Sequence, residues 1–194
     1  MRILVDIDET CNNLIEVLLE KYNAKYNDSV KIEDITEYEV QKFLKPGCEN
    51  IFTEFMCRDL IENLQENTGV SKVLCELAKD NKIYFLSATH PDFVQAKHNW
   101  LKKHFPFYTA DMFIACKDKN LVKGDLLIDD CLDYLKHSPC PHKICFSKPW
   151  NTSYTGHTMK TWTEFNHYFQ SIIDYYKFIE KLKTTNNIAD LINA

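Results

Sequence analysis

The first eight residues place two carboxylates at the end of a short apolar run. The segment reads RILVDID from position 2, and its ILV part has the pattern of a buried strand. Alternation along a strand puts Asp6 and Asp8 on the same side. Like charges so close repel each other, so the arrangement needs a cation or a protonated partner to offset it. An exposed acidic turn after an edge strand is the alternative, because Asp-rich turns are common.

Three further strand-like runs end in groups that interact with phosphate. KIYFLSATHP reaches the hydroxyl of Ser87, IACKDK ends in lysines, and GDLLIDD ends in Asp129 and Asp130. In open α/β sheets, ligands bind beyond the carboxyl ends of the strands. Carboxylates, a hydroxyl donor and a cation suit a phosphoryl group and a hard metal such as Mg²⁺. The order and placement of these four strand ends therefore indicate phosphate chemistry.

Strand-like runs alternate with helical periodicity, which predicts an α/β protein with a Rossmann-like parallel sheet and helices on both faces. The segment between the first two strands is far longer than a crossover helix requires. We therefore expect residues 15–67 to form an inserted helical cap, and residues 1–14 with 68–194 to form the core. The patterns predict helices over 10–26, 49–65, 71–80, 93–104 and 161–183. They predict later strands over 83–86, 111–116, 126–128 and 142–146, the last of these closing the sheet.

These motifs resemble a known family. DIDET, from Asp6 to Thr10, looks like the DxDx[TV] first motif of haloacid dehalogenase-like phosphatases. Ser87 matches the second motif, Lys119 the third, and the Asp129-Asp130 pair the fourth. More closely, DIDETCNNL, FLSATHP, LVKGDLLIDD and FSKPWN resemble the 5'(3')-deoxyribonucleotidase family, particularly its bacterial and phage-type members. The resemblance extends from the first residue to about position 169, and the cap region matches least well.

The resemblance implies roles for the acidic residues. Asp6 would be the nucleophile that forms an aspartyl-phosphate. Asp8 would protonate the leaving oxygen and then activate water. Mg²⁺ would be held by the side chains of Asp6 and Asp129 and by the backbone carbonyl of Asp8. Asp130 would orient a metal-bound water.

The resemblance also implies a phosphate-binding group made of Ser87, Ala88 and Lys119. Better-known mammalian members carry a second hydroxyl at the position of Ala88, so Thr89 could take over that contact. His90 is expected to lie close enough to contact substrate. Lys117 and Lys123 are alternative lysines, but the spacing of Lys119 from the second acidic pair matches the nucleotidase pattern. Glu9, at the variable position of the first motif, is expected to face solvent.

The resemblance implies a Mg²⁺-dependent phosphatase that hydrolyses (deoxy)nucleoside monophosphates. The cap would select the substrate by stacking the nucleoside base on aromatic side chains. The candidates are Tyr38, Phe43, Phe52, Phe55 and Trp150, and packing in the core explains each of them equally well. A phosphatase of another small phosphorylated metabolite is an alternative, as is a non-catalytic regulator with this fold. The intact set of motif residues argues against the regulator.

Composition limits the kinds of partner and the cellular compartment that are expected for this chain. The net charge of −5 and pI near 5.8 argue against a nucleic acid polymer as partner. No stretch is long enough to span a bilayer, and the N-terminus has the pattern of a strand and not of a signal peptide. The eight cysteines are scattered without CxxC spacing, which predicts reduced thiols and a cytoplasmic location. The family resemblance adds a homodimer as an expected assembly.

Overall fold

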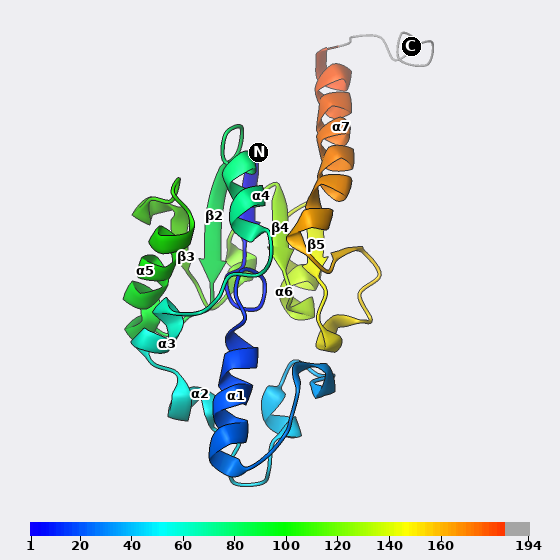
Figure 1. Ribbon diagram of the computed structural model, residues 1–194. Coiled ribbons are helices and arrows are strands. Elements are labelled where there is room, and N and C mark those ends of the chain that lie inside the picture. Colours follow the sequence, from blue (N-terminus) through cyan, green and yellow to red (C-terminus); the bar gives the residue numbers. More distant parts are fainter. Residues whose placement is uncertain (185–194) are drawn as a thin grey trace.

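The computed structural model of the chain describes residues 1–184, and its centre is a six-stranded sheet (Figure 1). The strand order is β3-β2-β1-β4-β5-β6, and every neighbouring pair is parallel. This arrangement confirms the predicted Rossmann-like α/β fold. The strands are β1 (Arg2–Val5), β2 (Lys82–Ser87), β3 (Phe113–Ala115), β4 (Leu126–Asp129), β5 (His142–Phe146) and β6 (His157–Met159).

Helices connect the strands and cover the sheet. They are α1 (Leu14–Tyr26), α2 (Ile51–Phe55), α3 (Arg58–Glu62), α4 (Val70–Leu77), α5 (Val94–His104), α6 (Leu132–His137) and α7 (Phe165–Thr184). Within residues 1–184, no helix is both long and apolar enough to cross a membrane. Residues 185–194 of the expected core segment lie outside the described residues.

Alternation along the central strands builds two apolar layers. Ile3 and Val5 belong to the larger core, which also includes the buried faces of α4, α5 and α7. Leu4 points to the opposite face and packs in a smaller cluster with Leu135 of α6. Burial of each such aliphatic side chain contributes roughly 1.5–3 kcal/mol relative to exposure. The two layers therefore hold β1, and the residues that follow it, rigidly between helices.

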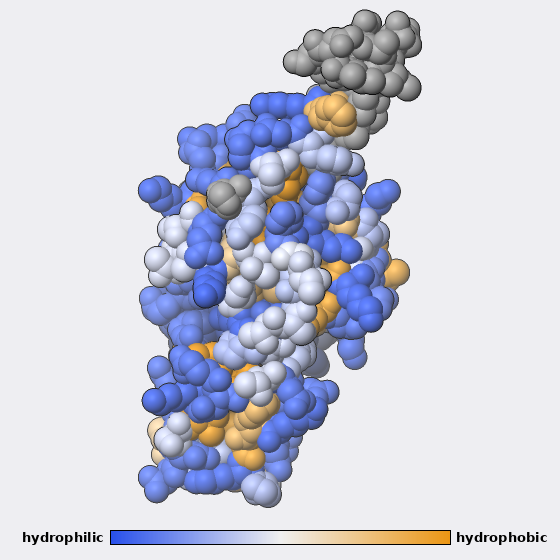
Figure 2. All heavy atoms as spheres, turned by 90° about the vertical axis from the view of Figure 1, so that its right-hand side faces the viewer, coloured by the Kyte–Doolittle hydropathy of each residue, from blue (hydrophilic) through white to orange (hydrophobic). Residues whose placement is uncertain are grey.

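A helical lobe lies beyond the carboxyl ends of the strands. Figure 1 shows α1 and α2 below the arrowhead of β2. The two connections to this lobe run together, because Asn12 and Glu66 form an antiparallel bridge and the backbone N–H of Asn67 donates to the carbonyl of Cys11 at 2.7 Å. Figure 2 shows a mostly hydrophilic face, with apolar residues gathered on part of this lower lobe.

Three expectations about secondary structure were wrong. The strand over 142–146 does not close the sheet, because the short polar strand β6 lies outside it without any apolar run to reveal it. The helix expected over 49–65 is interrupted, since Met56 and Cys57 are extended and separate α2 from α3. The first helix begins at Leu14 and not at Thr10, because residues 8–11 form a turn and Asn12 lies in the bridge to Glu66.

Gly124 precedes β4 at a place where no side chain fits. A Cβ there would lie 2.7 Å from Leu4 Cγ and 3.1 Å from the carbonyl oxygen of Arg2. We expect Gly124→Ala to lower the free energy of unfolding by about 1–3 kcal/mol, because overpacking pushes β4 away from β1. Urea denaturation measures this, with the exposed neighbour Lys123→Ala as the control. Equal stability of the two variants would contradict this close packing.

Candidate active site

The ends of β1 and β4 bring the two acidic motifs together. The strands are neighbours, with Val5 opposite Ile128, and the backbone N–H of Asp6 donates to the carbonyl of Ile128 at 2.9 Å. The side chains that follow therefore emerge side by side. Carboxylate oxygens of Asp6, Asp129 and Asp130 all lie within 4.8 Å of one another, and all three residues are buried.

Lys119 partly neutralises this cluster. It is 4% exposed, its Nζ forms an ion pair with Asp6, and it lies 2.8 Å from Asp129 Oδ2. Burial raises the pKa of Asp6 to about 7, with Lys119 opposing the shift and Asp129 and Asp8 adding to it. Burial would lower the pKa of Lys119, but the two carboxylates beside it raise that pKa overall. One ammonium therefore does not suffice to keep all three carboxylates ionised, and their full ionisation needs further positive charge.

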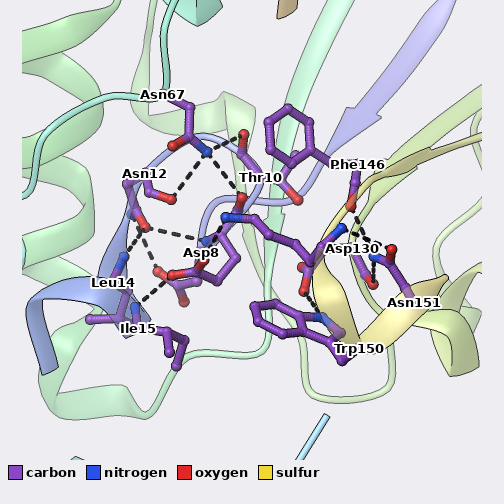
Figure 3. Close-up of polar contacts among 12 residues, drawn as sticks. Asp8, Thr10, Asn12, Leu14, Ile15, Asn67, Asp130, Phe146, Trp150 and Asn151 are labelled. Carbon is purple, nitrogen blue, oxygen red and sulfur yellow. Dashed lines mark hydrogen bonds and ion pairs between the residues drawn. The ribbon is translucent and has the colours of Figure 1, made fainter. Parts of the chain in front are cut away.

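The donor set fits Mg²⁺. Hard divalent cations take carboxylate oxygens, and a buried excess of negative charge favours such an ion. Asp6 and Asp129 would hold the metal. Asp130, whose pKa is raised by burial and by its acidic neighbours, lies beside them. It is fixed in place because Oδ2 accepts a hydrogen bond from Trp150 Nε1 at 2.9 Å and its carbonyl accepts one from Asn151 at 2.8 Å (Figure 3).

A second buried lysine, Lys97 on α5, lies on the other side of the site. Its Nζ forms an ion pair with Asp8 and donates to Ser87 Oγ at 2.9 Å. No role was expected for this lysine from the sequence. A signal was present, because Lys97 lies one helical turn before the buried Leu101 and shares the apolar face of the helix.

The loop after Asp8 is held by buried polar contacts. The expectation that Glu9 faces solvent was wrong, because it is 4% exposed and accepts hydrogen bonds from the Ile15 backbone at 2.5 Å and from Lys148 at 2.7 Å. Its backbone has φ of 61°, an uncommon conformation for a residue other than glycine. Figure 3 shows Asn67 reaching into this loop, where its Nδ2 donates to the carbonyls of residues 9, 10 and 12 at 3.0–3.2 Å.

The remaining predicted residues of the second motif follow β2. Ser87 is 1% exposed and Ala88 is exposed, and both line the cavity over the acidic cluster. The hydroxyl of Thr89 is buried without a hydrogen-bond partner among the described residues. His90 is exposed, and its Nδ1 accepts a hydrogen bond from the Asp92 backbone at 3.3 Å. The roles of these four residues stay predictions.

A cavity of about 340 Å³ opens over these groups. Its polar floor includes Asp6, Asp8, Ser87 and Lys119, and the wall on the side of the helical lobe is largely apolar. Of the five aromatic candidates, three line this cavity. They are Tyr38, Phe52 and Trp150, whereas Phe43 and Phe55 pack against the hydrophobic core.

A family model described as "5' nucleotidase, deoxy (Pyrimidine), cytosolic type C protein" matches residues 1–173. The chain belongs to this family. A protein named 5'(3')-deoxyribonucleotidase from Clostridium acetobutylicum is 34% identical over 127 residues, covering 65% of this chain and 71% of the relative. Another protein of that name, from Bacillus subtilis, is 29% identical over 151 residues, covering 77% of this chain and 86% of the relative.

Solved structures agree with this nucleotidase family at the level of the fold. A haloacid dehalogenase-like protein of unknown function from Agrobacterium tumefaciens has a TM-score of 0.57 at 10% identity, covering 89% of this chain and 98% of that one. A haloacid dehalogenase family hydrolase from Deinococcus radiodurans, with bound phosphate and sodium, has a TM-score of 0.58 at 8% identity. The match covers 88% of this chain and 95% of that one. The resemblance drawn from the motifs and the enzyme class, a phosphoric monoester hydrolase, are thus confirmed.

The acidic cluster predicts a stabilising effect of Mg²⁺. An ion that binds only the folded state stabilises it by about 2.7 kcal/mol at a concentration 100 times its Kd. We expect Mg²⁺ to raise the Tm of the parent, and Asp129→Asn to remove most of that rise because it removes a ligand. Thermal unfolding with and without Mg²⁺ measures the difference. Asp133→Asn, which removes a carboxylate 73% exposed on α6, is the control and should keep the full rise.

Proposed function

We propose that the chain is a Mg²⁺-dependent phosphatase that hydrolyses (deoxy)nucleoside monophosphates to nucleoside and phosphate. The observation that carries the proposal is the convergence of Asp6, Asp8, Ser87 and Lys119 on one cavity, beside the carboxylates of Asp129 and Asp130. The names of the two bacterial relatives support the nucleotide substrate.

In the first step, a carboxylate oxygen of Asp6 attacks phosphorus and the bond from phosphorus to the nucleoside oxygen breaks. Asp8 enters this step as the carboxylic acid, gives its proton to that leaving oxygen and becomes a carboxylate. Ser87 and Lys119 hold the phosphoryl oxygens, since phosphoryl transfer depends mainly on positioning and charge neutralisation. The product of this step is an aspartyl-phosphate on Asp6.

In the second step, water attacks phosphorus and Asp8 takes its proton, so the bond to Asp6 breaks and phosphate leaves. Mg²⁺, when bound by Asp6 and Asp129, supplies positive charge that stabilises the phosphoryl oxygens through the reaction. Asp8 is suited to both proton transfers because its side chain is 31% exposed and lines the cavity.

We further propose that residues 15–67 act as a substrate-selecting cap on the core formed by residues 1–14 and 68–194. Tyr38 and Phe52 come from this segment and line the cavity, which supports contact with an aromatic base. A cytoplasmic location is supported by the cysteines, since each of the eight is a free thiol. The homodimer stays a prediction that size-exclusion chromatography can test.

The central test is phosphate release from a panel of nucleoside and sugar monophosphates. We expect turnover of nucleotides that stops when Mg²⁺ is chelated, and a loss of about 1000-fold or more in Asp6→Asn, because the amide is not a nucleophile. Asp133→Asn is the control. Activity that survived chelation would contradict the metal assignment. Faster turnover of a sugar phosphate than of every nucleotide would favour the alternative function, a phosphatase of another small phosphorylated metabolite.

The cap predicts a selective effect on substrate affinity. Tyr38→Ala and Phe52→Ala each remove an aromatic face from the cavity, and such contacts contribute about 0.5–1.5 kcal/mol. We expect KM for nucleoside monophosphates to rise about 3- to 10-fold, with little change for a sugar phosphate that has no base. Phe178→Ala, 52% exposed on α7, is the control. An equal rise for both substrates would show that these rings act on the phosphate site and not on a base.

A further inference from the structure

Lys97 is one of two buried lysines among the described residues, and the other is Lys119. Its side chain is 1% exposed, and Lys102 and Lys103 on the same helix are exposed. Taking an ammonium group out of water costs several kcal/mol unless charged and polar partners compensate. The partners of Lys97 are Asp8 and Ser87, which both line the cavity.

The bond between Lys97 and Ser87 has a fixed direction. An ammonium group has three donors and no acceptor, so Ser87 Oγ must accept from Lys97 Nζ at 2.9 Å. The hydroxyl has one hydrogen, and this bond leaves that hydrogen unused. Within residues 1–184, the Ser87 hydroxyl has no other hydrogen-bond partner. Its hydrogen is therefore available to an acceptor in the cavity.

We propose that Lys97 is a positioning residue that makes Ser87 a donor toward the phosphoryl group and holds the Asp8 carboxylate beside it. The proposal rests on the proposed function, because it concerns the same phosphate site. Lys97 does not itself line the cavity, so it acts through its two partners. The two buried lysines thus have different partners. Lys119 pairs with Asp6, the nucleophile, and Lys97 pairs with Asp8, which transfers the proton.

Lys97→Met keeps the unbranched chain as far as its fourth heavy atom and removes the charge and donors of the ammonium group. We expect kcat to fall about 100-fold, since loss of one organised donor in a transition state costs that much. We expect KM to rise less, about 5- to 10-fold, because Ser87 also contacts the phosphate of the bound substrate. The matched control is Lys102→Met, at an exposed position of the same helix. A kcat within about 3-fold of the parent would overturn the proposal. An inactive parent would instead overturn the proposed function.

A double-mutant cycle separates positioning from a general structural effect. If Lys97 acts partly through Ser87, Lys97→Met must lower kcat less in a Ser87→Ala background than in the parent. Losses that simply multiply would show that Lys97 does not act through the hydroxyl, and would overturn that part of the proposal. Thermal unfolding of each variant confirms that the proteins compared are folded.

Lys97→Met could prevent folding, because it leaves the carboxylate of Asp8 without its partner. Asp8→Asn with Lys97→Met removes both charges, and binding of inorganic phosphate with Mg²⁺ is then the readout. Compared with Asp8→Asn alone, we expect phosphate affinity about 5- to 10-fold lower, because Ser87 no longer presents its hydrogen. Equal affinities, measured by calorimetry, would overturn the proposal.

Discussion

Burial of several carboxylates at one point is the constraint on which the rest of this structure depends. Asp6, Asp129 and Asp130 lie together with almost no access to solvent. Like charges in such a place raise one another's pKa, so they stay ionised only where cations compensate them. Lys119 supplies one positive charge, and a divalent ion is the natural source of the remainder. The positive charges of Lys119 and of the expected metal therefore together compensate the negative charge of the acidic cluster.

The parallel sheet makes this concentration of charge possible. Adjacent parallel strands end at the same edge, so β1 and β4 deliver their acids next to each other, and β2 delivers Ser87 beside them. The apolar layers on both faces fix the strands, which leaves the side chains at their ends little freedom to separate. The positions of the charged groups are thus fixed by an apolar core that takes no part in the chemistry of the site.

Loops from distant parts of the chain complete the site by contacting one another. Glu9 connects the first turn of α1 with Lys148, and Trp150 in the same loop as Lys148 donates to Asp130. The start of the helical lobe and the acidic cluster are linked through these buried contacts. A shift of α1 would therefore also move residues that line the cavity.

The sequence by itself determined the features that are local. Apolar runs that end in acids, a hydroxyl or lysine predicted the sheet, and Asp6, Asp8, Ser87, Lys119 and Asp129 were all found where four strands end. Only the tertiary structure decided which polar residues are buried between segments. Lys97 meets Asp8 across 89 positions of sequence, and Glu9 is covered by a loop that lies 139 positions away. Periodicity reports which face of an element is apolar, but it does not report which distant element supplies a charged partner.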